Sequence, residues 1–410
     1  MLMDEGKIIK FYREKANLTQ EQLSKGICSV THISKIERGI TEYSPEITYL
    51  LAKRLGIDIH SELHLLDGVA TLIQELENSL IMQNLDHAST IISKLVNIPL
   101  LVVSRFQTHF DLLLARYHCT QGNLKVAKKI LFTIQKKQEK LPIYENNLLK
   151  HVLAIYYLSD KKFIQAIDML KSINPQHYSN HEFYYNLAYS YHSIGSKVLA
   201  YYYAEKALTF FKETNNFYRI IDTETIMIVQ IGDNEYLNFQ ETISKYQSLL
   251  QTCDTCNFVD KKSKLLHNFA YTRYLRSELK EAQELYEEAM LLCKNKSPLY
   301  YYSFEGYIRC SFEGALLDKL QLLELVKDAI IHLKESNDQL SLILFTMLDY
   351  EITESPHFYQ YLDTVAIPFF KENELFWLVH QYEKRLYMYY AETNQMEKAL
   401  GVAHSILKIC

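Results

Sequence analysis

Small apolar residues recur along the 410-residue chain as pairs of alanines twelve positions apart. A large apolar residue precedes the first alanine of each pair, and a turn-prone stretch such as TQGN or SIGS separates the two. Two antiparallel helices approach closely only where small side chains face each other, so each pair predicts a helical hairpin. The pairs are Ala115 with Ala127, Ala154 with Ala166, Ala188 with Ala200, and Ala270 with Ala282.

The spacing of these hairpins indicates a repeat array. The second alanines of the first three pairs follow one another after 39 and 34 residues, and such periods are typical of tetratricopeptide-like repeats. Ala88 extends the series toward the amino terminus and Ala399 ends it. About nine hairpins fit residues 73–410, so we expect an all-α fold with a right-handed superhelical solenoid. The first helix of each hairpin is expected to form its concave inner wall.

Residues 1–60 show a different pattern, made of signals that start and stop short helices. Thr19 and Gln22 predict a capping box, so a helix is expected to begin at Gln20. Four or five short helices follow from the signals, two of them joined by a tight turn. The further signals are a turn at Gly26 and Cys28, an N-cap at Ser29, a stop at Gly39 and a start at Ser44-Pro45-Glu46.

This arrangement resembles the helix-turn-helix of the Cro and phage-repressor-like (XRE) family. The matching residues are Arg13, Leu18-Thr19-Gln20, Leu23, Ile33-Ser34-x-Ile36-Glu37-x-Gly39 and Leu55-Gly56-Ile57. The resemblance implies that the second helix of the pair lies in the major groove of double-stranded DNA. The expected base contacts are Val30, Thr31 and Lys35, with His32 close by, and the expected phosphate contacts are Gln20, Ser29 and Arg38.

Arg13 and Glu37 are left out of this DNA-binding set, because the family pairs these two positions in a partly buried ion pair. The alternative interpretation of the segment is a helical hairpin whose basic residues are merely solvated. Residues 1–60 carry a net charge of only +1, within a chain of net charge −5. Attraction to nucleic acid would therefore be modest and would need doubling by a dimer.

Composition limits which folds and which kinds of functional site the rest of the chain can have. Only 11 glycines and 7 prolines are present, too few turn formers for a many-stranded sheet. Seven cysteines without a regular framework fit thiols kept reduced in a cytosol, and the short apolar runs argue against a membrane span, so we expect a cytoplasmic protein. Cys253 and Cys256 form an isolated pair, and a structural zinc needs four ligands. We therefore expect no metal, no cofactor and no enzymatic activity.

Two asparagines occupy equivalent places in the matched repeats. Asn186 and Asn268 each stand two residues before the first alanine, and Tyr189 and Tyr271 follow at i+3 on the same helical face. An amide offers a donor and an acceptor together, which suits the backbone of an extended peptide. The alternative is a pair of solvated asparagines beside core aromatic residues. Weaker candidates for the same wall are Arg116, His192, Glu224, Glu305 and Arg309.

The whole chain, a helix-turn-helix followed by a long repeat array, resembles the RNPP family of intracellular peptide receptors of Gram-positive bacteria. The resemblance implies a helix-turn-helix DNA-binding domain at 1–60, a linker at 61–72, and a repeat domain at 73–410 for peptide binding and dimerisation. It further implies a quorum-sensing transcriptional regulator, a homodimer or higher oligomer, whose activity and oligomeric state are controlled by a short signalling peptide in the concave groove.

Two other interpretations of the chain stay open. One is a phage-encoded peptide receptor that controls lysis and lysogeny with the same architecture. The other is a protein-binding adaptor that acts on a sporulation phosphorelay component, with a phosphorelay response regulator as partner. The sequence identifies neither the peptide nor the operator, and it does not separate activation from repression.

Overall fold

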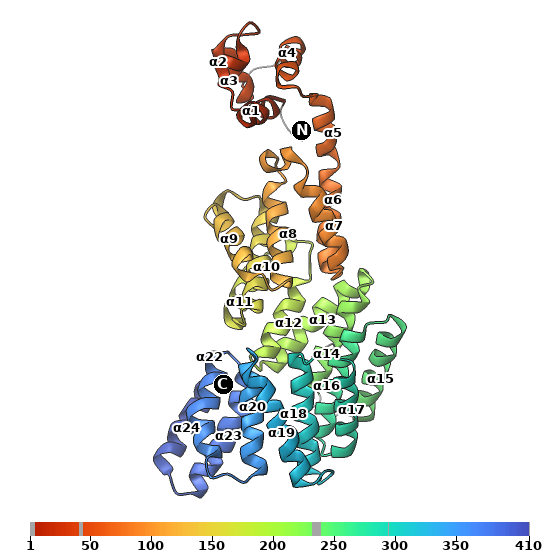
Figure 1. Ribbon diagram of the computed structural model, residues 1–410, viewed down its shortest axis with the longest axis vertical. Helices are drawn as coiled ribbons and strands as arrows, with labels where there is room; N and C mark the ends of the chain where they lie inside the picture. The colour runs from red at the N-terminus through yellow and green to blue at the C-terminus, as the bar shows by residue number, and fades with distance from the viewer. Residues whose placement is uncertain (1–4, 41–43, 232–238, 294, 410) are drawn as a thin grey trace. The chain divides into compact units, whose positions relative to one another are not determined.

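The computed structural model describes residues 5–40, 44–231, 239–293 and 295–409. In these ranges the regular elements are helices, and no strand is present (Figure 1). The expected all-α fold class is confirmed. Two compact units divide the chain: Met1–Ser159 with Ile173–Tyr178, and Asp160–Ser172 with Ser179–Cys410. We call them unit 1 and unit 2. Among the described residues, no helix is long and apolar enough to cross a bilayer.

Unit 1 begins with four short helices, as the start signals predict. Thr19 accepts a hydrogen bond from the Gln22 backbone and Gln22 returns one to the Thr19 backbone, so the capping box is present. Gly26 (φ +75°) and Gly39 (φ +68°) adopt the left-handed conformation where helices end. Ser44 precedes the next helix without capping it by its side chain. The helices are α1 (Glu5–Lys15), α2 (Gln20–Ser24), α3 (Val30–Glu37) and α4 (Pro45–Leu55).

Unit 1 continues with longer helices. The segment 61–72, where the sequence predicts a linker, lies in α5 and the start of α6, with Gly68 between the two helices. The expected linker is therefore helical. The elements are α5 (Ile59–Asp67), α6 (Val69–Ile81), α7 (Leu85–Val96), η1 (Pro99–Val103), α8 (Gln107–Thr120), α9 (Leu124–Gln135), η2 (Gln138–Lys140), α10 (Ile143–Ser159) and η3 (Pro175–His177).

Unit 2 holds the remaining helices, which follow one another from green to blue in Figure 1. One turn of π-helix, η4, interrupts the run between α21 and α22. The elements are α11 (Phe163–Lys171), α12 (Phe183–Ser193), α13 (Lys197–Glu213), α14 (Phe217–Ile231), α15 (Phe239–Thr255), α16 (Val259–Tyr274), α17 (Leu279–Leu291), α18 (Pro298–Glu313), α19 (Lys319–Lys334), α20 (Gln339–Ile352), α21 (Phe358–Tyr361), η4 (Leu362–Ala366), α22 (Ile367–Glu372), α23 (Phe376–Glu392) and α24 (Met396–Ile409).

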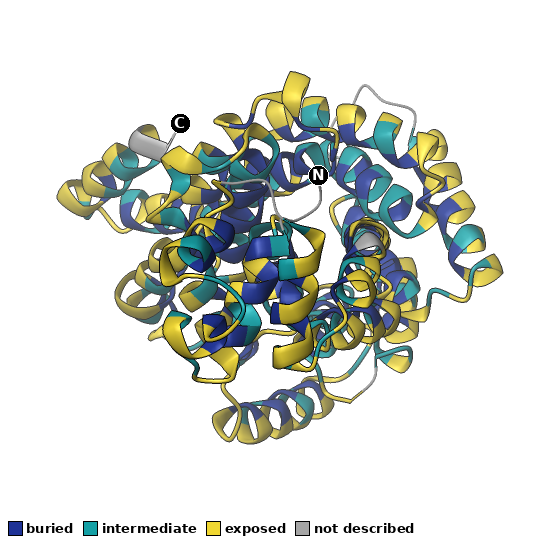
Figure 2. Cartoon of the chain, turned by 90° about the horizontal axis from the view of Figure 1, so that it is seen from above, coloured by how far each residue is buried: buried dark blue, intermediate teal, exposed yellow. Residues whose placement is uncertain are grey.

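The paired alanines lie where the helices of a hairpin meet. All eight are fully buried, and α8 packs on α9, α12 on α13 and α16 on α17. The remaining pair, Ala154 and Ala166, is divided between the two units. In the described ranges, α6 to α24 follow one another as nine successive helix pairs when α21, η4 and α22 are counted together as one interrupted helix. Nine is the number that the repeat spacing predicts. Figure 2 shows that buried and exposed positions alternate around the helices, with the buried positions on the faces that pack against other helices.

Candidate functional site

The first turns of α3 present the residues that the sequence assigns to DNA. Ser29 caps the helix by accepting a hydrogen bond from the His32 backbone at 3.2 Å. Val30, Thr31 and Lys35 are exposed, and Val30 keeps 45% of its surface accessible although it is apolar. An exposed apolar residue at the start of a recognition helix suits contact with a thymine methyl group. Val30 and Thr31 lie in the first turn and Lys35 follows Thr31 by four residues, about one helical turn, so these side chains can reach neighbouring base pairs.

A buried ion pair fixes α3 against α1. Arg13 donates from Nε to Glu37 Oε1 at 2.6 Å and from a terminal nitrogen to Glu37 Oε2 at 2.9 Å, a bidentate arrangement. Gln20 of α2 donates to the same Oε2 at 2.8 Å. The amide of Gln20 is thus partly committed to Glu37, which weakens its candidacy for a phosphate. Arg38 is exposed, and its Nε donates to the Ser34 carbonyl at 3.1 Å.

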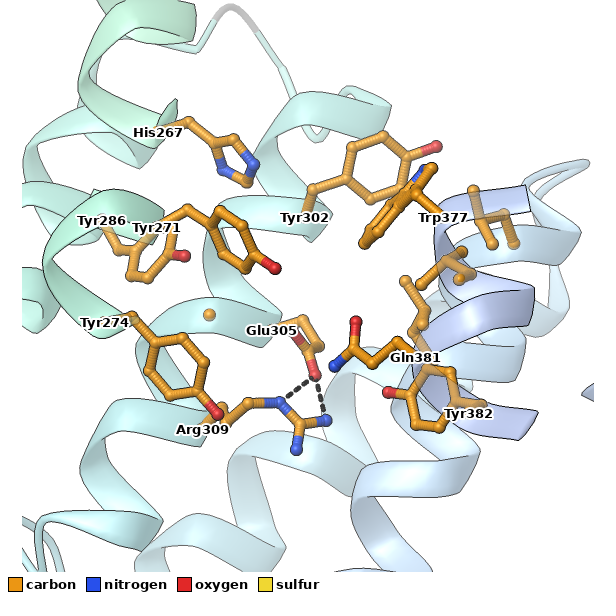
Figure 3. Close-up of a pocket in the computed structure, with 14 residues that line it drawn as sticks. His267, Tyr271, Tyr274, Tyr286, Tyr302, Glu305, Arg309, Trp377, Gln381 and Tyr382 are labelled. Carbon is orange, nitrogen blue, oxygen red and sulfur yellow. Dashed lines mark hydrogen bonds and ion pairs between the residues drawn. The ribbon is translucent and has the colours of Figure 1, made fainter. Parts of the chain in front are cut away.

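A cavity of about 160 Å³ opens on one side of unit 2. Its walls come mainly from α16, α18, α20 and α23, each the first helix of a pair (Figure 3). The first helices therefore line a common trough in this part of unit 2, as the repeat pattern predicts. Aromatic and apolar side chains dominate the lining, which consists of His267, Tyr271, Tyr274, Tyr286, Tyr302, Glu305, Gly306, Arg309, Leu340, Leu344, Trp377, Leu378, Gln381 and Tyr382.

The polar part of the cavity is an arginine held by two carboxylates. Arg309 donates to Glu305 at 2.8 and 2.5 Å, one helical turn away, and to Glu351 of α20 at 3.1 Å. Glu351 also pairs with Arg385 of α23. Three first helices are thereby tied together by charge. Glu305 and Arg309 both line the cavity, and Arg309 pairs with Glu305 and with Glu351 (Figure 3). A ligand in the cavity therefore meets a Glu305 carboxylate whose charge is largely compensated by Arg309.

His267 is neutral at ordinary pH. Burial lowers the pKa of its imidazole to about 4, and its Nδ1 lies 3.0 Å from the Ser303 hydroxyl. The cavity therefore offers hydrogen-bonding groups of little net charge among tyrosines. Burial also raises the pKa of Tyr302 and of Tyr382 to about 12, so both phenols stay protonated and can donate.

Gly306 sets the depth of the cavity floor. A Cβ at this position would stand 2.4 Å from the buried Tyr286 ring, so the ring would have to shift to make room for it. We expect Gly306→Ala to cost about 1–3 kcal/mol of folding free energy by overpacking. Gly401→Ala is the matched control, because its Cβ would meet nothing within 4 Å in α24. Urea unfolding that shows equal midpoints for the two variants would contradict this geometry.

Comparisons with known proteins match the helix-turn-helix segment and, separately, most of the chain. Residues 9–60 fit the helix-turn-helix family model. The chain is 21% identical over 408 residues to the transcriptional activator NprA of Geobacillus stearothermophilus, covering 92% of this chain and 96% of the relative. The apo quorum sensor NprR from B. thuringiensis is similar with a TM-score of 0.66 at 18% identity, covering 84% and 99% of the two chains. NprR in complex with its cognate peptide NprX gives 0.68 at 18% identity, covering 83% and 98%.

Over most of its length the chain is similar to NprA and NprR, and it shares the helical repeat fold of the NprR structures. The expected resemblance to peptide-responsive regulators of this type is borne out at the level of sequence similarity and fold.

Three of the expected groove residues line the cavity: Tyr271, Glu305 and Arg309. Asn268 lies half-buried on α16, one turn before Thr272, and does not line it. The cavity thus includes only part of the expected inner wall. The remaining candidates lie on α8, α12 and α14.

The α12 candidates lie apart from the cavity. Asn186 is only 6% exposed, whereas Tyr189 keeps 40% of its surface accessible and packs edge-on against Phe163 of α11. The two residues therefore differ in accessibility although they share a helical face. His192 Nδ1 lies 2.8 Å from the Gln230 amide of α14, so it joins two first helices. For Asn186, Tyr189 and Asn268, peptide contact stays a prediction.

Two further candidates lie apart from the cavity. Arg116 is 1% exposed in unit 1 and donates to the Leu80 carbonyl at the end of α6, so it caps a helix inside the core. Glu224 shares a separate hollow with residues of α13 and α15, and Lys212 of α13 approaches it to 3.6 Å. For both positions, peptide contact stays a prediction.

Sequence reasoning missed the far wall of the cavity. Tyr302 of α18 and Trp377, Gln381 and Tyr382 of α23 face Tyr271 across it (Figure 3). The chain has a single tryptophan, and it is 48% exposed on this wall. A lone tryptophan was the one available signal, because tryptophan is enriched at binding hot spots and is rarely left half-exposed without use.

A second polar cluster of unit 2 also went unnoticed. Arg219 of α14 pairs with Glu182 and Asp222 at 3.2 Å each, and Lys261 of α16 pairs with Asp222 at 2.6 Å. Arg219 also stacks over the Tyr185 ring at 4.5 Å. Burial outweighs the attraction of Asp222 and lowers the pKa of Lys261 to about 8. The cluster joins α12, α14 and α16 as the Arg309 network joins α18, α20 and α23.

Proposed function

We propose that the chain is a quorum-sensing transcriptional regulator that binds double-stranded DNA through residues 1–60 and a short signalling peptide on the inner wall of its repeat domain at 73–410. The cavity among α16, α18, α20 and α23 carries this proposal, because it is lined by the first helices of successive pairs. NprR has a similar fold and its structure is known in complex with its cognate peptide NprX, which supports the same use of this fold here. The function is binding rather than catalysis.

The chemistry of the cavity favours a peptide with a large apolar or aromatic side chain. A cavity of about 150 Å³ lined by apolar side chains is known to bind benzene, and this one measures about 160 Å³. The tyrosine hydroxyls, Gln381 and Glu305 can pair with the peptide backbone beside that side chain. Peptide binding would then draw α16 and α23 together across the trough. The proposed assembly is a cytoplasmic homodimer or higher oligomer that places two helix-turn-helix modules on DNA.

The DNA half is tested on the full-length chain with duplexes selected from a random pool. We expect the double variant Thr31→Ala, Lys35→Ala to lose about 1–3 kcal/mol of binding free energy for each base contact removed. A gel shift on the selected duplex measures this loss. Lys10→Ala is the control, because Lys10 is an exposed lysine of α1 and is not among the expected DNA contacts. Equal binding by parent and double variant would contradict the α3 assignment. Failure of the parent to enrich any duplex would contradict DNA binding altogether.

A further inference from the structure

Helix α9 of unit 1 carries an unusually basic outer face. Residues 123–140 contain six lysines and one glutamate, a net charge of +5 in a chain whose total is −5. All six lysine side chains are exposed. We call Lys125, Lys128, Lys129 and Lys136, which lie on or directly after α9, the α9 lysine face.

The α9 lysine face is one continuous stripe. At about 100° per residue, its four lysines and Phe132 fall within an arc of about 100°, and the stripe is about 16 Å long. The opposite side of the helix holds Ala127, Leu131 and Ile134, which are buried against the unit. Lys128 lies over the Phe132 ring at 5.7 Å, and Phe132 is 38% exposed. The lysines therefore form a surface fixed to a packed helix.

This arrangement is unfavourable for the free protein. Lys125 follows Leu124 in the first turn of α9, which holds no acidic residue, although a helix amino terminus favours negative charge. Lys125 and Lys129 stand at i and i+4, where like charges repel by about 0.2–0.5 kcal/mol. Among the described residues, none of the α9 lysine face forms an ion pair. The contact of Lys128 with the Phe132 ring is uncharged on the ring side, so the positive charge of the face is left without an anion to balance it, and an anionic partner would supply one.

We propose that the α9 lysine face binds the phosphate backbone of DNA, as a second and sequence-independent contact beside the site that α3 reads. This inference rests on the proposed DNA-binding function. Residues 1–60 supply only +1 of charge, whereas α9 lies in the same compact unit and adds the missing attraction. Lysines are compact point charges that suit phosphates, and they are depleted at protein–protein interfaces. A duplex therefore fits this face better than an acidic protein does.

The test compares two full-length variants of equal charge. In the first, Lys125, Lys128, Lys129 and Lys136 become glutamine. In the second, the matched control, four exposed lysines of unit 2 become glutamine: Lys280, Lys327, Lys334 and Lys384. Fluorescence anisotropy then follows binding to a labelled 40-base-pair duplex, carrying the sequence selected by the parent, from low to moderate salt. Circular dichroism confirms that each variant is folded.

The slope of log affinity against log salt separates the outcomes. We expect the α9 variant to lower this slope by about 2 to 4, since each phosphate contact contributes about 0.9. The selected duplex should stay preferred over a random one, because α3 is untouched. The control variant should keep the parent slope. Equal slopes for the two variants would overturn the inference while leaving the α3 site standing.

Discussion

Replacing Glu37 by alanine is expected to unfold the helix-turn-helix module at temperatures where the parent is intact. The Glu37 side chain is 2% exposed and accepts two bonds from Arg13 and one from Gln20, so its removal leaves a guanidinium buried among α1, α2 and α3. Breaking a buried pair from one side costs about 3–5 kcal/mol. Binding to the selected duplex should disappear with the module, and amide exchange should show α1 to α4 unprotected.

A double replacement supplies the control. Arg13→Met together with Glu37→Leu removes both charges and keeps apolar volume, so it should recover most of the lost stability. Glu37→Ala that exchanges as slowly as the parent would show that the ion pair contributes little. In that case the module would depend on its apolar core at Ile8, Leu23 and Ile33 instead.

Replacing Arg309 by leucine is expected to abolish peptide binding. The change leaves Glu305 and Glu351 without the arginine that pairs with both, in a region where their side chains are only 15% and 10% exposed. Glu351 keeps its pair with Arg385, but Glu305 becomes an uncompensated buried carboxylate, which costs about 3–5 kcal/mol, and α18 and α20 lose their common tie. Calorimetry with a heptapeptide selected against the parent should show at least a hundredfold weaker association.

Arg385 offers the comparison within the same network. It pairs with Glu351 as Arg309 does, yet its side chain is 41% exposed. An exposed pair contributes about 0–1 kcal/mol, so Arg385→Ala should bind the peptide within about fivefold of the parent. If Arg309→Leu also stays within that range, the polar part of the cavity has no role in binding.

The helical hairpins could be predicted because their determinants are local. The capping box of Thr19 and Gln22 and the buried alanine pairs each depend on residues within one helix or one hairpin. The ion pair of Arg13 and Glu37 was reached only through the family resemblance, because 24 residues separate the partners.

The cavity could be predicted only in part, because it depends on the register between helices far apart in sequence. Tyr271 and Trp377 face each other across more than a hundred residues, and no periodic signal connects α16 with α23. The repeat of Glu224 lacks an alanine pair that would set which face packs inward, so the sequence does not fix where this side chain lies. The burial of Arg116 could not be predicted either, because it depends on a helix-end carbonyl 36 residues away in the sequence.

Trp377 gives the most direct test of the peptide groove, because it is the only tryptophan of the chain and stands half-exposed on the cavity wall. The measurement is a fluorescence titration of the full-length protein with a heptapeptide that carries no tryptophan and was selected from a random library by binding to it. Our account predicts a saturable blue shift of the Trp377 emission, with a midpoint equal to the calorimetric Kd, that is lost in Arg309→Leu. Calorimetric binding without any change in emission would place the peptide elsewhere and contradict the account.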